Sequence, residues 1–134
     1  MEWAIKQGVD LINMSFGYTF EDIKLKKVLE DARDKGIIIL AAASNDGAHS
    51  GIAWPANDPS VAICVHASVD LGRKYLDFTP TPKLEPLLNF IVVGENVWSH
   101  WPVSKGGDFR TMSGTSTATP VATAIAALLL AFMQ

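Results

Sequence analysis

Ser116 stands where a short hydroxyl-rich motif enters a long apolar segment. The motif is Gly-Thr-Ser-Thr-Ala-Thr-Pro at residues 114–120. If residues 115–133 form a helix, the Ser116 hydroxyl lies beside free backbone N–H groups and the positive end of the helix dipole. These groups stabilise negative charge that develops next to an attacking oxygen, as acyl transfer requires. The pattern also fits a simpler interpretation, in which Ser116 or Thr117 only caps the helix.

Asn45 is the second candidate, and it follows an apolar run at residues 37–43. The carboxyl end of a buried parallel strand is where α/β sheets place their ligands. A side-chain amide there can donate a hydrogen bond to a developing negative charge. However, the sequence Asn-Asp-Gly at residues 45–47 also favours an Asx turn. Taken alone, the segment favours the turn.

The remaining patterns predict one α/β domain over residues 1–134 with a mostly parallel sheet. Residues 37–43 are apolar at every position, which is typical of a strand buried on both faces. Further strands are expected at 9–16, 61–65 and 90–93, and helices at 2–7, 21–35 and 115–133. We expect Thr19 to cap the second helix and Gly36 to end it. Residues 79–86, rich in proline, are expected to be irregular.

The last predicted helix, residues 115–133, is apolar on all sides, so we expect it at the centre of the protein. Pro120 is tolerable in its first turn. The uninterrupted apolar stretch at 124–133 is too short to span a bilayer of about 30 Å. No membrane partner is therefore predicted.

Composition narrows the classes of function. The net charge is -3 and basic residues are scattered, so neither nucleic acid nor an anionic membrane surface is predicted as a partner. Cys64 is the sole cysteine and lies in an apolar run, which predicts a buried thiol and no intrachain disulfide. No cofactor or metal-ligand cluster is indicated. No signal peptide is visible, and localisation stays open because a segment preceding Met1 would hide one.

Taken together and in order, three segments resemble the subtilisin-like serine peptidases of the S8 family. They read Ile-Asn-Met-Ser-Phe-Gly at 12–17, Ala-Ala-Ala-Ser-Asn-Asp-Gly at 41–47 and Ser-Gly-Thr-Ser-Thr-Ala-Thr-Pro at 113–120. Weaker similarity covers nearly all of the chain except residues 75–89. The resemblance implies a subtilisin-like three-layer sandwich with a mostly parallel sheet, whose N-terminal part is missing.

The resemblance also implies roles for individual residues. Ser116 resembles the nucleophile, and Asn45 resembles the oxyanion donor that acts together with the Ser116 backbone N–H. Thr115 resembles a support of that site. Ser15, Phe16 and Gly17 resemble the extended segment that pairs with substrate backbone. The residues that resemble one wall of the side-chain pocket are Ala41, Ala42, Ala43 and Ser44. Ser44 replaces the glycine usual in the family, which predicts a narrower or altered pocket.

The family's Asp-Thr/Ser-Gly and His-Gly-Thr motifs are absent from this sequence. A serine hydroxyl needs a base, usually a histidine oriented by a carboxylate. His49, His66 and His100 lie in no such motif, and Asp46 is read as a turn residue. We expect the missing groups upstream of Met1 and an unpaired apolar sheet edge in this chain. The sequence thus predicts a serine endopeptidase fragment acting on polypeptide, or alternatively a non-catalytic peptide-binding pseudopeptidase.

Overall fold

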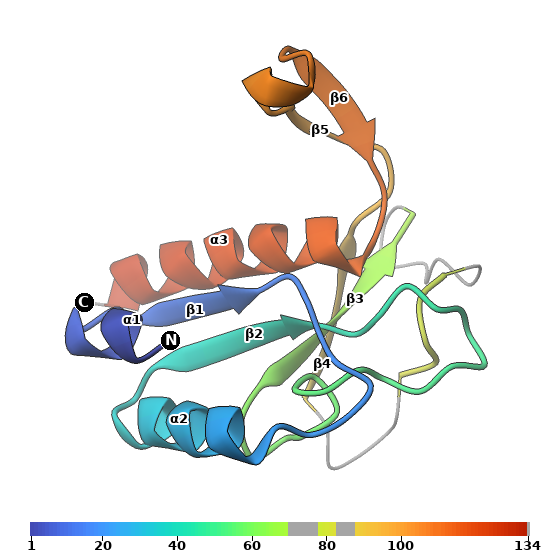
Figure 1. The fold of residues 1–134 in the computed structure, drawn as a ribbon. Helices are drawn as coiled ribbons and strands as arrows, with labels where there is room; N and C mark the ends of the chain where they lie inside the picture. Colours follow the sequence, from blue (N-terminus) through green and yellow to red (C-terminus); the bar gives the residue numbers. More distant parts are fainter. Residues whose placement is uncertain (70–77, 83–87, 134) are drawn as a thin grey trace.

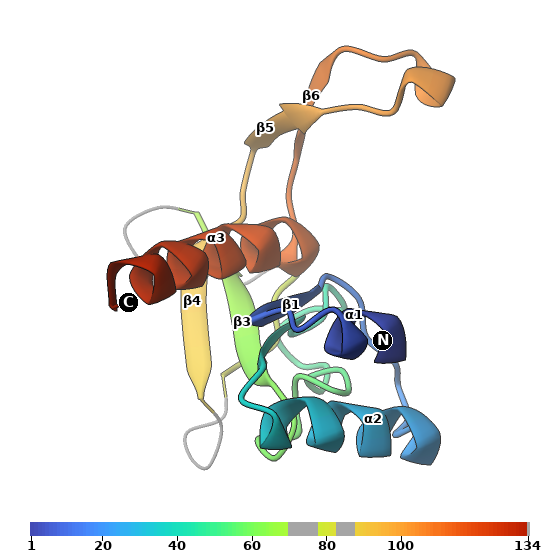
Figure 2. The same ribbon diagram turned by 90° about the vertical axis from the view of Figure 1, so that its left-hand side faces the viewer.

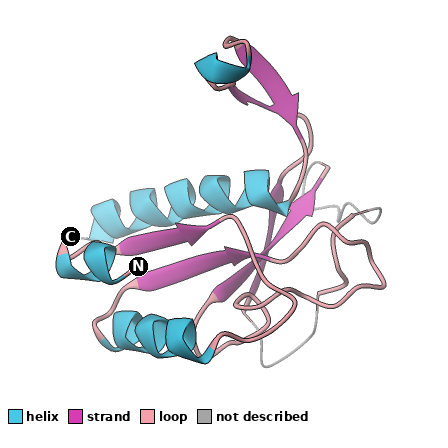
Figure 3. Cartoon of the chain, viewed as in Figure 1, coloured by secondary structure: helices cyan, strands magenta, loops and turns pink. Residues whose placement is uncertain are grey.

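A four-stranded parallel sheet forms the middle layer of the protein. The computed structural model describes residues 1–69, 78–82 and 88–133. The strands β1 (Leu11–Met14), β2 (Ile38–Ala42), β3 (Ile63–Ser68) and β4 (Asn89–Val93) lie side by side in the order β1-β2-β3-β4, all parallel. Figures 1 and 3 show helices on both sides of this sheet. The predicted α/β three-layer sandwich is confirmed.

Two helices cover one face of the sheet and one helix covers the other. Figure 2 shows α1 (Glu2–Lys6) and α2 (Ile23–Asp34) on the same side, and α3 (Thr115–Met133) on the opposite side. The alternation of side chains along the strands creates two cores. Ile39 and Ala41 of β2 face the layer of α1 and α2, whereas Leu40 faces α3. This is why residues 37–43 are apolar without a break.

Helix α2 begins later than the sequence predicted. Asp22, not Thr19, is its N-cap, and Asp22 Oδ1 accepts hydrogen bonds from the backbone N–H of Lys24 at 2.9 Å and of Leu25 at 3.0 Å. The prediction was wrong because two capping residues, Thr19 and Asp22, lie close together here, and only the aspartate adjoins the first helical turn. Gly36 follows the helix with a φ of 81°, so its predicted role as the stop is confirmed.

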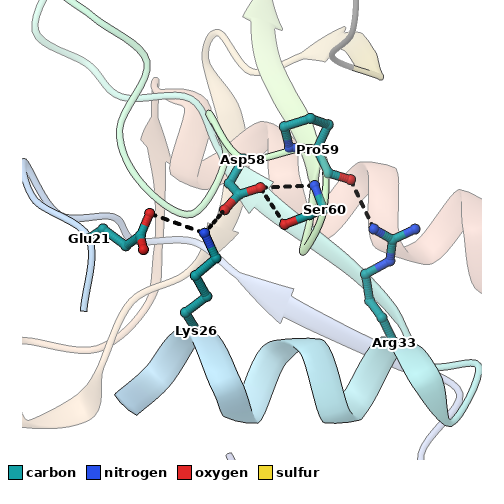
Figure 4. A network of polar contacts seen from close by, with 6 residues as sticks. All are labelled: Glu21, Lys26, Arg33, Asp58, Pro59 and Ser60. Carbon is teal, nitrogen blue, oxygen red and sulfur yellow. Dashed lines mark hydrogen bonds and ion pairs between the residues drawn. The ribbon is translucent and has the colours of Figure 1, made fainter. Parts of the chain in front are cut away.

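Polar contacts tie α2 to the segment that enters β3 (Figure 4). Lys26 Nζ lies 2.9 Å from Asp58 Oδ2 and 3.3 Å from Glu21 Oε2. Arg33 donates a hydrogen bond to the Pro59 carbonyl at 2.9 Å. Partial burial raises the pKa of the Asp58 carboxyl, but hydrogen bonds from Ser60 and Lys26 outweigh this and lower it overall. The helix is therefore fixed in place on the sheet.

Strand β3 and the following residues depart from the predicted pattern. β3 runs to Ser68 rather than ending at Val65, and His66 lies fully buried within it. The apolar run ends at Val65 because His66 is polar, although the strand continues through it. Of the stretch predicted to be irregular, residues 79–82 form no helix or strand, and 83–86 lie outside the described residues.

An antiparallel hairpin, which the sequence did not predict, extends away from the sheet (Figure 1). It consists of β5 (Val97–His100), the 3-10 turn η1 (Val103–Lys105) and β6 (Phe109–Met112). The Trp98 and Phe109 rings stack across it with centroids 5.8 Å apart. His100 is the last residue of β5, and its ring packs against Phe109.

Helix α3 is not central, contrary to the prediction, because only its inner face is covered. That face packs on the sheet through Ala118 and Ala122, whereas Leu128 is 73% and Phe132 is 93% exposed. Pro120 lies in the second turn and not in the first. By length and composition alone the helix could cross a membrane, since Thr and Ala residues extend its apolar stretch. Its packing against the sheet is equally typical of a core helix, so the predicted lack of a membrane partner stays a prediction.

Candidate active site

The segments that follow the carboxyl ends of β1 and β2, together with the start of α3, surround a cleft of about 260 Å³. Asn45 follows β2, residues 15–17 follow β1, and Ser116 begins α3. Because β1 and β2 are parallel neighbours, their carboxyl ends lie together at one edge of the sheet, and the amino end of α3 contributes to the same cleft. Of the residues singled out in the sequence, those that line the cleft are Ser15, Phe16, Gly17, Ser44, Asn45, Thr115 and Ser116.

Asn45 is anchored to α3 through Thr115. Its side-chain oxygen Oδ1 accepts hydrogen bonds from the Thr115 backbone N–H at 2.8 Å and from the Thr115 hydroxyl at 3.1 Å. The side-chain oxygen is thereby assigned, because a nitrogen in its place would face two donors. The other amide atom, Nδ2, remains a donor that points elsewhere.

Gly114 shows where that donor points. A Cβ built on Gly114 would lie 3.1 Å from Asn45 Nδ2 and 3.3 Å from Ser116 Oγ. Both atoms therefore lie on the same side of Gly114, which has a φ of 154°. A side chain at residue 114 would therefore crowd both the Asn45 amide and the Ser116 hydroxyl, which glycine avoids.

The backbone N–H of Ser116 adds a second donor at this place. It belongs to the first turn of α3, where N–H groups have no partner within the helix. Thr117 does not compete for the same space, because its hydroxyl donates to the carbonyl oxygens of Gly94 at 3.0 Å and of Gly114 at 2.7 Å. The helix start thus offers an anion-stabilising N–H beside the Ser116 hydroxyl.

Ser44 has an unusual backbone for a residue with a side chain. Its φ is 130°, in the region that favours glycine. Its hydroxyl donates to Asp46 Oδ2 at 2.6 Å and accepts from the Asp46 backbone N–H at 3.0 Å. The sequence identified Ser44 in a glycine position, and the structure retains the glycine-like conformation there.

Ala43 does not line the cleft, although it was expected in the wall of the side-chain pocket. It is fully buried among the residues of the core on the α1 and α2 side. The backbone groups of Ala43 are also hydrogen-bonded, because its N–H donates to the Val65 carbonyl and its carbonyl accepts from the Ala53 N–H. Of the other residues expected in this wall, Ala42 does line the cleft, whereas Ala41 is buried in the same core as Ala43.

Sequence reasoning missed four other residues of the cleft, which are Tyr18, Thr19, Asp46 and Ala53. Tyr18 exchanges two backbone hydrogen bonds with Trp54, at 2.8 and 2.9 Å. A Cβ on Gly17 would lie 2.7 Å from Ala53 Cβ, so this segment is held closely against residues 53–54. The sequence around Gly17 and Tyr18 could have drawn attention to this segment. Its pairing with Trp54, which is 36 residues away from Tyr18, cannot be predicted from the local sequence.

None of the three histidines of the chain lines the cleft. His66 is buried in β3, where its Nε2 lies 3.3 Å from Cys64 Sγ and 3.1 Å from Asn89 Oδ1. His100 lies in the hairpin, and His49 is in a loop. Within the described ranges, no cluster of three or more His, Cys, Asp or Glu residues could hold a metal ion. The described cleft thus offers a hydroxyl and two N–H donors without an imidazole.

Known proteins show the same arrangement of sequence and fold. The sequence pattern of the subtilase family, peptidase S8, matches residues 1–134. The chain is 41% identical to the subtilisin-like protease het-Q2 of Podospora anserina, over 99% of this chain and 37% of that protein. It is 35% identical to subtilisin E of Bacillus subtilis, over 97% of this chain and 33% of that protein.

Solved structures agree with these similarities. The patellamide maturation protease PatA superimposes with a TM-score of 0.83 at 32% identity, covering 96% of this chain and 47% of that chain. The prenylagaramide maturation protease PagA gives a TM-score of 0.84 at 30% identity, covering 98% and 47%. The chain therefore spans about a third of the curated relatives and about half of these protease domains.

Proposed function

Because the chain belongs to the subtilase family of peptidases, we propose that it carries the nucleophile and the oxyanion site of a serine endopeptidase. In this proposal Ser116 Oγ attacks the carbonyl carbon of a peptide bond and forms an ester with the acyl part. The amine part leaves with a proton, and water then hydrolyses the ester. Ser116 occupies the cleft with donors beside it, which supports this role.

The orientation of Asn45 is the observation that carries the proposal. Attack by Ser116 places negative charge on the former carbonyl oxygen, and two N–H donors must face it. Asn45 Nδ2 and the Ser116 N–H can both do so, because Thr115 holds the amide oxygen at 2.8 Å and 3.1 Å on the other side. A helix cap at Ser116 would not require this fixed amide.

The base that accepts the Ser116 proton is proposed to come from residues outside 1–134. No histidine of this chain lines the cleft, and loss of the base in such enzymes costs nearly as much rate as loss of the whole triad. We therefore expect very low activity from residues 1–134 alone. The polypeptide substrate is proposed to pair with the extended segment 15–17, in the manner of an added β-strand.

Covalent labelling tests the proposal. The natural full-length protein is treated with a fluorophosphonate, and the labelled residue is identified by mass spectrometry. We expect label on Ser116, none on the Ser116→Ala variant, and slower labelling of Asn45→Ala. In subtilisin itself, removing one such donor costs about 10²–10³ in rate, and we expect a loss of the same order here. A folded full-length protein whose Ser116 stays unlabelled would disprove the proposal.

A second candidate function is peptide binding without hydrolysis. The absence of histidine from the cleft lining favours it. In that case peptide affinity survives Ser116→Ala, and no cleavage is detected even at high protein concentration. Turnover that depends on Ser116 would exclude this alternative. The two candidates thus differ in one measurement on the same pair of proteins.

A further inference from the structure

The hairpin formed by β5 and β6 begins and ends close to Ser116. It leaves the sheet after Gly94, which follows β4, and returns at Gly114, two residues before Ser116. Figure 1 shows that it extends away from the sheet, and its Trp98 and Val103 side chains are 65% and 89% exposed. Segments with few buried contacts open at low free energy. A movement of the hairpin would therefore shift Ser116 unless its base were fixed.

Hydrogen bonds close the base of the hairpin at a junction that consists of Gly94, Gly114 and Thr117. The Gly94 carbonyl accepts hydrogen bonds from the Gly114 N–H at 2.8 Å and from the Thr117 hydroxyl at 3.0 Å. The Thr117 hydroxyl also lies 2.7 Å from the Gly114 carbonyl oxygen, so its one hydrogen is shared between the two ends of the hairpin. Beside the junction, the Ser113 hydroxyl accepts a hydrogen bond from the Asn96 N–H at 2.9 Å.

Gly94 connects this junction to the sheet. Its N–H donates to the Ser68 carbonyl, at the end of β3, at 3.0 Å. A Cβ built on Gly94 would lie 2.8 Å from both the Ala67 Cβ and the Gly114 carbonyl oxygen, and 2.9 Å from the Ala118 Cβ. Gly94 is therefore packed between the sheet and the first turn of α3. Its carbonyl oxygen is a fixed acceptor for the Thr117 hydroxyl.

The hydrogen bond from Thr117 to Gly94 differs from an ordinary contact within a helix. A threonine near a helix start commonly bonds a carbonyl three or four residues before it, as Thr117 does with Gly114. Gly94, in contrast, is 23 residues away in the chain. Because Thr117 directly follows Ser116, this long-range bond fixes the residue next to the proposed nucleophile.

We propose that Thr117 is a positioning residue, whose hydroxyl keeps Ser116 in place when the hairpin moves. The inference rests on the proposed function for the role of Ser116. Thr117 does not line the cleft, so it acts through the junction and not by touching the substrate. Loss of its hydrogen bond should lower the fraction of molecules in which Ser116 is aligned, and the acylation rate should fall about two- to tenfold.

Labelling kinetics test the proposal. The natural full-length protein and its Thr117→Val variant are reacted with a fluorophosphonate over a range of concentrations, which separates the affinity for the reagent from the maximal labelling rate. Valine keeps the shape of threonine and removes the hydroxyl. We expect the maximal rate to fall about two- to tenfold at unchanged affinity. Thr117→Ser, which retains the hydroxyl, should restore much of the rate.

Thr123→Val is the matched control. Thr123 is also a partly buried threonine of α3, and its hydroxyl donates to the Thr119 carbonyl at 2.8 Å and to the Asn13 side-chain oxygen at 3.2 Å. This variant loses the same chemical group away from the junction and should keep the labelling rate. Equal slowing by Thr117→Val and Thr123→Val would overturn the inference, as would an unchanged rate in Thr117→Val.

Amide hydrogen exchange examines the junction without any variant. In the unmodified full-length protein, the Gly114 N–H should exchange more slowly than the Trp101 N–H, which donates to the Asp108 carbonyl at 2.7 Å within the hairpin. In Thr117→Val the Gly114 exchange should become about two- to tenfold faster, while the Trp101 exchange stays the same. Equal exchange of the two amides in the unmodified protein would show that the junction opens together with the hairpin, which would overturn the inference.

These outcomes separate the inference from the proposed function. If Ser116 is labelled at the same rate with and without the Thr117 hydroxyl, only the positioning role is disproved. If the unmodified protein takes no label, the proposed function fails, and the Gly114 exchange alone decides whether Thr117 holds the junction.

Discussion

Asn45 and Thr115 are 70 residues apart in the chain, yet the Asn45 side-chain oxygen accepts hydrogen bonds from both the N–H and the hydroxyl of Thr115. These two bonds join the carboxyl end of β2 to the start of α3. They also decide which atom of the amide faces Ser116. The orientation of the proposed oxyanion donor therefore depends on a residue that does not itself contact the reacting atoms.

Thr115→Val tests this dependence. Valine keeps the shape of the 1% exposed side chain and removes the hydroxyl. Loss of about 1 kcal/mol from these hydrogen bonds corresponds to about fivefold in rate. We expect slower fluorophosphonate labelling of Ser116 by about that factor in the natural full-length protein. Thr115→Ser, which retains the hydroxyl, should restore much of the rate.

Thr119→Val is the control for Thr115→Val. Thr119 is also a fully buried threonine of α3, and its hydroxyl donates to the Thr115 carbonyl at 2.7 Å without contacting Asn45. The two variants should lose similar free energy of unfolding, measured in urea. Only Thr115→Val should slow labelling. Equal slowing by both would show that helix stability, and not the amide orientation, sets the rate.

Gly114→Ala should damage the site directly. The added methyl group would lie 3.1 Å from Asn45 Nδ2 and 3.3 Å from Ser116 Oγ, at a φ of 154°. We expect loss of about 1–3 kcal/mol in unfolding free energy from the backbone strain, together with strongly reduced labelling. Gly8→Ala is the matched control, since Gly8 has a φ of 67° and a Cβ added to it would meet no atom within 4 Å. It should lose stability and keep its labelling rate.

Cys64 predicts a pH dependence of stability. Burial raises the pKa of its thiol from 9.0 to about 12. Below pH 9 the thiol is protonated in both the folded and the unfolded state. As the pH rises from 9 towards 12, the unfolded state releases the proton first, so the free energy of unfolding falls by up to about 1.4 kcal/mol per pH unit from this group. Urea titrations at pH 8 to 10.5 measure this slope.

Cys64→Ala supplies the control for the thiol. Its slope above pH 9 should be smaller by about one proton, whatever stability the smaller side chain costs. An alkylating reagent gives a second readout, because the thiolate is the reactive form. The folded protein at pH 8 should resist alkylation and react after unfolding. Rapid alkylation of the folded protein would contradict a buried thiol.

The parts of the fold that sequence predicted are those with a local physical signal. Residues 37–43 form β2 because a strand covered on both faces has no polar position. The hairpin was missed because its two strands are defined by each other, through pairs such as Trp98 and Thr111, and not by an alternating pattern. The glycines at 106 and 107, both with positive φ, were its available turn signal.

The candidate site could be predicted only in part for a similar reason. Hydroxyl and amide residues at a helix start and a strand end suggested chemistry, but each pattern also fitted a cap or a turn. Only the resemblance to a family favoured the catalytic interpretation over a cap or a turn. The contact between Asn45 and Thr115 joins residues that are distant in the sequence, so no local pattern predicts it. Asp46 was interpreted as a turn residue, and Tyr18 and Thr19, which line the cleft with it, come near it only through the fold.

The outer face of α3 is the clearest difference between expectation and structure. Because α3 carries no charged residue, it was expected at the centre of the protein. Its composition does not show which other elements pack around it. In this chain Ile125, Leu128, Leu129 and Phe132 are exposed along one stripe. The edge strand β4 adds Phe90 and Val93, both exposed. An apolar surface of this kind promotes self-association in water.

Charged substitutions on this stripe should improve the solubility of residues 1–134 without loss of stability. Leu128→Lys and Phe132→Lys remove side chains that are 73% and 93% exposed, so little buried contact is lost. We expect less aggregation by light scattering and an unchanged free energy of unfolding. Ala122→Lys, on the buried face of the same helix, should instead destabilise the fold. If Leu128→Lys and Phe132→Lys destabilised the chain as strongly as Ala122→Lys, that result would contradict the exposure of these two side chains.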